Sequence, residues 1–176
     1  DNIYGGDSAD SLYGGDDTDW LNGDAGDDVI YGGDGDDSNI AGTIGLFGAA
    51  GNDYLDGGRG ADWLEGSGDN DTLLGGAGND SINPGTGADV IAFNLGDGQD
   101  TIAASIGSDN VLSLGGGIAY ADISLRKSGN HLIIDIGASD RITLANWYAS
   151  PDNRSVLTLQ VIAEAMADFD AGGADP

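Results

Sequence analysis

The 176-residue sequence contains no cysteine, one histidine, and only five lysine and arginine residues. Without cysteine, disulfide bonds, thiol catalysis and cysteine-based zinc sites are excluded. The scarcity of positive charge argues against binding to nucleic-acid backbones or anionic membrane surfaces, because both require a basic face. Apolar runs are short, and none reaches the roughly 18 residues that a membrane-spanning helix needs.

Aspartate and glycine are abundant instead. The chain has 29 aspartates but only two glutamates, 33 glycines, and a net charge of −26. Aspartate and glycine are poor helix formers, so this composition does not favour a helical protein. A high content of glycine and charged residues is often typical of disordered chains. Here the glycines and aspartates are regularly spaced, and a disordered chain lacks such spacing.

The spacing is a nine-residue repeat. From Gly5 the units are GGDSADSLY, GGDDTDWLN, GDAGDDVIY and GGDGDDSNI; after residues 41–47 they resume at Gly48 and continue to residue 103. Position eight is leucine or isoleucine in nine of ten units, with Asn39 the exception. Position six is aspartate in all ten: Asp10, Asp19, Asp28, Asp37, Asp53, Asp62, Asp71, Asp80, Asp89 and Asp100. Asp1 would occupy position six of an earlier unit, so we expect this chain to be part of a longer protein.

The repeat predicts thin coils that need a cation. Glycines at positions one, two and four permit tight turns with positive φ, and the next three residues suit a short strand. Two units would form one 18-residue coil that buries about two large apolar side chains, a small core. Stacked turns would bring carboxylates and main-chain carbonyls together. These hard oxygen donors suit Ca²⁺ better than Mg²⁺, which keeps its waters and requires octahedral geometry.

These units resemble the GGxGxDxUx nonapeptides of the RTX (repeats-in-toxin, haemolysin-type) calcium-binding proteins. The resemblance implies an all-β fold, a parallel β-roll with calcium between stacked turns. It also implies that the ten position-six aspartates, and Asp1, are side-chain ligands, with turn carbonyls completing each site. Two stacks of five turns leave about eight gaps for ions, and eight divalent ions would bring the net charge from −26 to −10.

Some turns depart from the pattern. Residues other than glycine at positions two and four predict looser turns; they are Ser8, Asp17, Asp24, Ala49, Ser67 and Asp69. We expect the insertion at residues 41–47 to interrupt the roll, with Ile44, Leu46 and Phe47 in a bulged loop over apolar surface. Together with Asn39, it puts the ions between the Gly23 and Gly48 turns and between the Gly32 and Gly57 turns in doubt.

Residues 104–176 differ in composition from residues 1–103 and are predicted to cap the roll. The net charge is −21 over residues 1–103 and −5 over residues 104–176. Alternating apolar runs predict strands at 111–114, 123–126, 131–136, 141–144 and 156–159, and residues 161–169 favour a short helix. This segment, with Trp147 and Tyr148, resembles the one that follows the repeats in RTX blocks of the adenylate cyclase toxin type. An open solenoid end needs such a cap.

The function expected is a non-catalytic calcium-binding module of a larger secreted or cell-surface protein, which folds on binding Ca²⁺ after export. The resemblance implies type I secretion machinery as a partner, besides parent-protein domains preceding residue 1. The module could instead be a ligand-binding or structural segment of a giant adhesin or surface-layer protein, or the tail of a secreted protease, lipase or toxin. A sugar-binding strip including Trp20 and Trp63 remains open, and His131 is expected to be structural.

Overall fold

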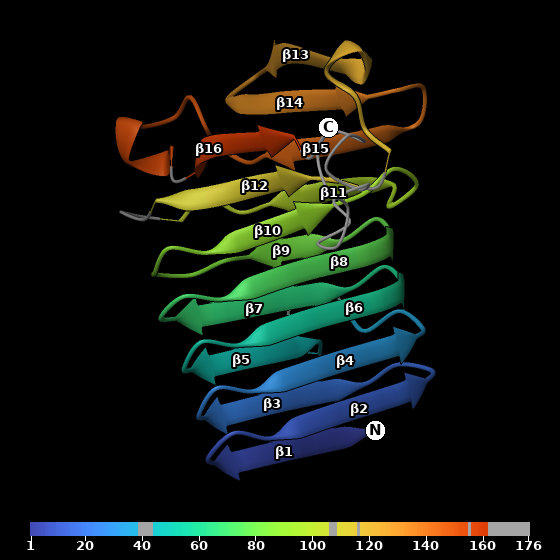
Figure 1. Ribbon diagram of the computed structural model, residues 1–176, viewed down its shortest axis with the longest axis vertical. Helices are drawn as coiled ribbons and strands as arrows, with labels where there is room; N and C mark the ends of the chain where they lie inside the picture. Colours follow the sequence, from blue (N-terminus) through green and yellow to red (C-terminus); the bar gives the residue numbers. More distant parts are fainter. Residues whose placement is uncertain (39–43, 106–108, 116, 155, 162–176) are drawn as a thin grey trace, which may run out of the picture.

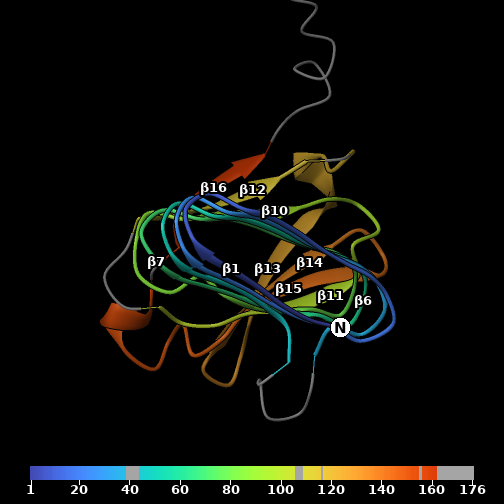
Figure 2. The same cartoon turned by 90° about the horizontal axis from the view of Figure 1, so that it is seen from below.

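The computed structural model describes residues 1–38, 44–105, 109–115, 117–154 and 156–161. The chain winds as a stack of flattened coils, with the N-terminus at one end and the C-terminal strands at the other (Figure 1). Viewed along the stack, successive coils superimpose on one another (Figure 2). The all-β fold expected from the repeat, a parallel β-roll, is confirmed.

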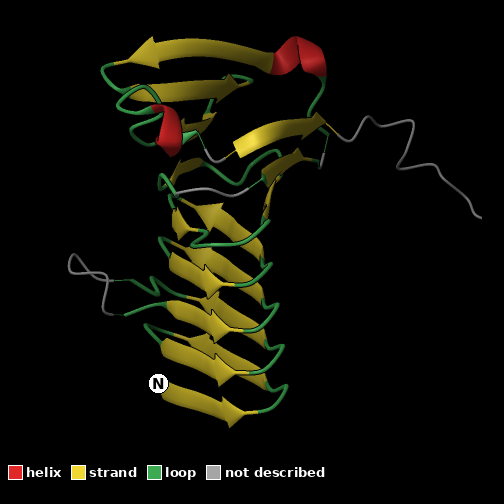
Figure 3. Cartoon of the chain, turned by 90° about the vertical axis from the view of Figure 1, so that its left-hand side faces the viewer, coloured by secondary structure: helices red, strands yellow, loops and turns green. Residues whose placement is uncertain are grey.

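Two sheets form the walls of the roll, and consecutive strands alternate between them (Figure 3). In the repeat region the first sheet consists of β1 (Asn2–Asp7), β3 (Trp20–Ala25), β5 (Leu46–Ala50), β7 (Trp63–Gly68), β9 (Ser81–Asn83) and β11 (Gln99–Ile102). The second consists of β2 (Ser11–Asp16), β4 (Val29–Asp34), β6 (Tyr54–Gly60), β8 (Thr72–Gly78) and β10 (Val90–Phe93). All neighbouring pairs among these strands are parallel.

The core is a column of position-eight side chains between the two sheets. Strand pairing sets each of these side chains beside its counterpart one coil away, as in the pair Leu55 and Leu73. Nearly all are fully buried: Leu12, Leu21, Ile30, Leu46, Leu55, Leu64, Leu73, Ile82, Ile91 and Ile102. A column of one residue per strand explains why position eight tolerates only large apolar side chains.

The expectation that residues 41–47 interrupt the roll is wrong. Leu21 pairs with Leu46, and Ile30 pairs with Leu55, so both sheets continue in register through this coil. Leu46 is fully buried at position eight, and Phe47 follows it within β5 rather than in a covering loop. Leu46, rather than Asn39, takes position eight in this coil because the core requires an apolar side chain and asparagine is polar.

The turns without glycine keep the backbone of the others. Positive φ occurs at all six such positions, Ser8, Asp17, Asp24, Ala49, Ser67 and Asp69, with values between 70° and 95°. Glycines at the same positions, such as Gly58 and Gly76, also have positive φ. Stacking therefore imposes the left-handed conformation even where a Cβ makes it costly, by roughly 1–2 kcal/mol.

The strands predicted beyond residue 103 form, and they extend both sheets. They are β12 (Asn110–Leu114), β13 (Ile123–Ser128), β14 (His131–Ile136), β15 (Asp140–Leu144) and β16 (Val156–Val161). Strands β12 and β16 continue the second sheet in parallel, while β15 joins β11 in parallel and carries the antiparallel β14 and β13. Two short 3-10 helices, Tyr120–Asp122 and Pro151–Asn153, lie between them.

The predicted helix at 161–169 lies outside the described residues, except Val161, which ends β16. The domain boundary at residue 103 stays a prediction, and the strand pairing runs across it. Across the described ranges, no helix has the length and hydropathy needed to span a bilayer.

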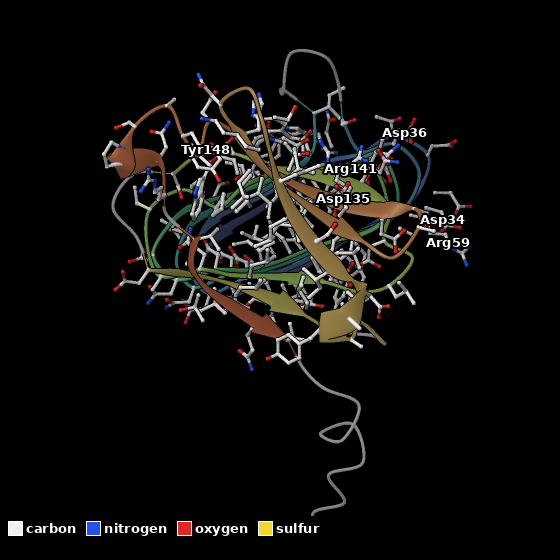
Figure 4. The ribbon with its side chains drawn as sticks, turned by 90° about the horizontal axis from the view of Figure 1, so that it is seen from above. Asp34, Asp36, Arg59, Asp135, Arg141 and Tyr148 are labelled. Atoms are coloured by element: carbon white, nitrogen blue, oxygen red, sulfur yellow. The ribbon has the colours of Figure 1, made fainter. Side chains whose placement is uncertain are left out.

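A charged cluster fixes the outer strands of the C-terminal region. Asp135 of β14 accepts hydrogen bonds from Nε of Arg126 at 2.5 Å and Nε of Arg141 at 2.7 Å. Arg141 and Asp135 lie close together at this end of the molecule, well away from the exposed pair of Asp34 and Arg59 (Figure 4). The two guanidinium groups lower the pKa of Asp135 by hydrogen bonding and charge.

Candidate metal-binding turns

The position-six aspartates form two ladders along the edges of the roll. The main-chain N–H of each donates to Oδ1 of its counterpart one coil later, at 2.8–3.0 Å. The first stack comprises Asp10, Asp28, Asp53, Asp71 and Asp89, and the second comprises Asp19, Asp37, Asp62, Asp80 and Asp100. Both ladders run across the insertion, because Asp28 donates to Asp53 at 2.8 Å and Asp37 to Asp62 at 2.9 Å.

The second carboxylate oxygen, Oδ2, has no hydrogen-bond partner. Nine of these atoms are buried and unpaired; they belong to Asp10, Asp19, Asp28, Asp37, Asp53, Asp62, Asp71, Asp80 and Asp89. A buried carboxylate oxygen without a partner is strongly unfavourable, since neither water nor a donor replaces its hydration. Repetition of the same unpaired atom in turn after turn indicates that these oxygens face a common kind of ligand.

In the eight turns that have glycine at position one, Oδ2 of the aspartate packs against that glycine and leaves no room for a Cβ. A Cβ added to Gly14 would lie 2.4 Å from Oδ2 of Asp19 and 2.6 Å from the carbonyl oxygen of Gly32 on the next coil. At Gly23 the corresponding distances are 2.2 Å to Asp28 and 2.8 Å to Gly48. The absence of a side chain at position one thus lets a carboxylate oxygen and a main-chain oxygen of the next coil come close together.

Burial makes the negative charge of these aspartates costly. It raises the pKa of Asp80 to about 8 and that of Asp71 to about 7, while a main-chain N–H bond to each partly offsets the increase. Burial likewise raises the pKa of Asp100 to about 7, and the pKa values of Asp37 and Asp62 to about 6. Neighbouring aspartates add to the increase by repulsion. A cation would remove both penalties.

The available donors suit calcium. They are carboxylate and carbonyl oxygens, without nitrogen or sulfur, which is the ligand set that calcium prefers. Within the described part of the chain, no three histidine, cysteine, aspartate or glutamate side chains gather at one point. A cation here would therefore take most of its ligands from main-chain carbonyls, and the residues present fit a calcium ion between neighbouring turns.

Comparison with known proteins identifies the repeat. The family model of the RTX calcium-binding nonapeptide repeat matches in four copies, at residues 1–30, 13–38, 46–64 and 56–91. The chain carries RTX calcium-binding nonapeptide repeats. No curated protein matches it. The crystal structure of the extracellular lipase LipA from Serratia marcescens is similar at 18% identity and a TM-score of 0.43. The match covers 93% of this chain and 40% of the lipase chain.

Asp1 lies in line with the second stack of RTX turns, but its side chain is exposed. Its carbonyl accepts from the N–H of Trp20 at 2.9 Å, the same bond that Asp53 accepts from Thr72. Its α-amino group donates to Oδ1 of Asp19, as a main-chain N–H does in later coils. The main chain of Asp1 therefore occupies position six of the RTX unit.

One further unit escaped the sequence prediction. Asn110 accepts a hydrogen bond at Oδ1 from the N–H of Asp89 at 2.9 Å, so it extends the first ladder by one coil. Residues 105–113 fit the RTX spacing with Ser105 at position one, Asn110 at position six and Leu112 at position eight. The buried Leu112, two residues after Asn110, is the signal that could have revealed it.

The remaining candidates have local partners. Nδ1 of His131 accepts from the N–H of Asn146 at 3.2 Å and so joins β14 to the segment after β15. Trp20 contacts Tyr4 and Phe47, with ring centroids 4.5 and 6.0 Å apart, respectively. Trp63 packs instead near the main chain at Gly45.

Proposed function

We propose that the chain is a non-catalytic calcium-binding module of a larger secreted protein, and that it folds when calcium binds. The observation that carries this proposal is the row of nine buried, unpaired Oδ2 atoms. A folded roll without a cation would retain all nine penalties, whereas a chain that is not folded would leave these carboxylates in water. Calcium binding and folding are therefore expected to be one event.

The proposed ligands are the position-six aspartates and the carbonyls of positions one to five in neighbouring turns. The aspartates are Asp10, Asp19, Asp28, Asp37, Asp53, Asp62, Asp71, Asp80, Asp89 and Asp100, with Asp1 in the same line. About eight ions would occupy the gaps, four in each stack. Bound calcium supplies positive charge that neutralises neighbouring carboxylates and joins one turn to the next.

Coupled folding would also serve export. At the low calcium concentration inside a cell, repulsion between carboxylates would keep the chain open. Outside the cell, each site would add RT ln(1+[Ca²⁺]/Kd) to the stability of the folded form. Several sites acting together make folding steep in calcium. This behaviour suits a protein that is secreted unfolded, and a type I route agrees with the RTX resemblance.

The test is far-UV circular dichroism of the chain during titration with calcium, starting in excess chelator. We expect a coil spectrum in chelator and a cooperative gain of β signal with calcium, and no such gain with the same concentrations of magnesium. A chain equally ordered in chelator, or one ordered equally well by magnesium, would contradict the proposal.

A further inference from the structure

We infer that the first stack ends at Asn110 without a cation, because the side chains of Ser105 and Asn110 pair with each other where calcium would be needed elsewhere. The inference rests on the proposed function, since it distinguishes a turn that needs no ion from turns that do. The first stack would then need no calcium ion where the C-terminal region begins.

Asn110 stands where the next aspartate of the first stack would be. Strand β12 lies next to β10 in the second sheet (Figure 1). Their parallel pairing sets Val90 beside Val111, which places Asn110 one coil beyond Asp89. Asn110 is fully buried. Its Oδ1 accepts from the N–H of Asp89 at 2.9 Å, the bond that every aspartate of the ladder makes. Since a main-chain N–H needs an acceptor, the amide oxygen must face Asp89.

The amide nitrogen then occupies the corner at which the aspartates carry Oδ2. An –NH₂ group has two donors and no acceptor, so it cannot bind a cation there. Nδ2 of Asn110 donates instead to Oγ of Ser105 at 3.2 Å. Ser105 is itself buried, with 5% of its surface exposed. No buried side-chain polar atom of either residue lacks a partner, in contrast to Oδ2 of Asp89.

Ser105 carries a side chain at the position where eight other turns have glycine. It precedes Asn110 by five residues, as Gly66 precedes Asp71. At Gly66 an added Cβ would lie 2.3 Å from Oδ2 of Asp71 and 2.6 Å from the carbonyl oxygen of Pro84, so a side chain does not fit beside the aspartate. Beside Asn110 the serine side chain is present, and its Oγ accepts from the amide nitrogen that takes the place of Oδ2.

The second stack also has no aspartate in register at this level. Pairing of β11 with β15 sets Asp100 beside the fully buried Ile142, and the nearby buried carboxylate of Asp140 already accepts from the N–H of Gly96 at 2.6 Å. Both stacks therefore end where the C-terminal strands begin, one with a satisfied amide and the other with an aliphatic side chain. A coil that needs no ion gives the last calcium-dependent coil a neighbour on which to stack.

The test is to exchange the two kinds of pair and count bound calcium by native mass spectrometry at saturating calcium. Ser105→Gly with Asn110→Asp restores positions one and six of the repeat, so we expect one more calcium ion than in the wild type. Asp71→Asn makes the reverse exchange at position six within the roll and should bind one ion fewer; Gly66 is kept, because an added Cβ there would lie 2.6 Å from the carbonyl oxygen of Pro84. Circular dichroism must first show that each variant reaches the wild-type β signal.

An equal calcium count in the wild type and in the Ser105→Gly/Asn110→Asp variant would overturn the inference. Such a result would mean either that the natural turn already binds an ion or that this pair is not what excludes one. If the wild type bound no calcium, the proposed function itself would fail. If the wild type bound calcium and only the expected extra ion were missing, this inference alone would fail.

Asn110→Asp alone provides a second measurement should the double variant not fold. With Ser105 unchanged, the added carboxylate is buried without an ion, so the midpoint of calcium-induced folding should rise several-fold. If Asn110 were already a calcium ligand, the same change would strengthen binding. A lower or unchanged midpoint would therefore overturn the inference.

Discussion

At the scale of single residues, each position-six aspartate has two separate roles. Oδ1 accepts a main-chain N–H from the preceding coil, and Oδ2 lies buried without a partner. Asparagine can reproduce the first role but not the second, which explains why Asn110 continues the ladder while every lower turn has aspartate. The two roles can therefore be separated by substitution.

Asp71→Asn should keep the ladder and lose one ion. At calcium a hundred times above the dissociation constant of a site, the lost site lowers folding stability by about 2.7 kcal/mol. We expect a higher calcium midpoint by circular dichroism and one fewer bound ion by mass spectrometry. Asp16→Asn is the matched control, because Asp16 is exposed at position three of its turn. Equal shifts in both variants would show that only total charge matters.

Acid should partly replace calcium. Burial raises the pKa of Asp80 to about 8 and that of Asp71 to about 7, above the ordinary value of 3.8. Groups with raised pKa values favour the folded form at low pH, and this stability is lost as pH rises through the folded values. In calcium-free buffer the β signal should therefore be greater near pH 5 than near pH 8. A β signal that is independent of pH would contradict the burial of these carboxylates.

The sequence was sufficient to locate the candidate ligands but not to assign different roles to their Oδ1 and Oδ2 atoms. Strict spacing identified the ten aspartates, because a nine-residue repeat returns each side chain to the same place in the turn. The bond from Asp53 to Oδ1 of Asp71 depends on the stagger between coils, which no single repeat encodes. Asn110 was missed because the search required aspartate at position six, although its spacing to Leu112 is regular.

At the scale of strands and turns, register dominates local preference. Ala49 adopts φ of 79°, a conformation that suits glycine, because its turn stacks between two others. The same effect places Leu46 rather than Asn39 in the core. The boundary of the insertion could not be predicted from the sequence, because the nine-residue spacing continues through residue 40. Which apolar residue takes position eight depends on the stacking of the core side chains in the folded roll.

Ala49→Gly should stabilise the roll. Removing Cβ relieves the left-handed strain, roughly 1 kcal/mol, and should lower the calcium midpoint of folding. Gly76→Ala is the opposite change at the same position of a later turn; φ there is 92°, and an added Cβ would lie 2.1 Å from the carbonyl oxygen of Gly58. It should raise the midpoint. If Ala49→Gly raised the midpoint as well, backbone strain would not limit this turn.

At the scale of the whole molecule, a highly charged roll adjoins a less charged end whose strands carry several buried apolar side chains. The C-terminal strands contribute Leu112, Leu114, Ile134, Ile136 and Ile142 to one continuous core with the repeats. Trp147 is partly buried against that core and, with Leu112, Leu132 and Val156, lines an apolar cavity between the two sheets. This end is therefore the best candidate for the part of the chain that folds first.

Trp147→Ala should weaken calcium-induced folding along the entire chain. Loss of the buried part of the indole costs about 2 kcal/mol, and a weaker end gives the first coil a poorer neighbour. The calcium midpoint should rise, as measured by circular dichroism. Tyr120→Ala is a suitable control, because 73% of Tyr120 is exposed. A midpoint unchanged by Trp147→Ala would rule out nucleation at this end.

The seven extra residues between β4 and β5 have a practical consequence. They lengthen the spacing between paired aspartates from 18 to 25, yet both sheets and both ladders continue as before. The number of residues in a coil is thus not fixed by the coils on either side of it. Foreign peptides spliced in ahead of Gly45 should therefore leave both ladders in place, on a scaffold that we propose calcium assembles and a chelator dismantles.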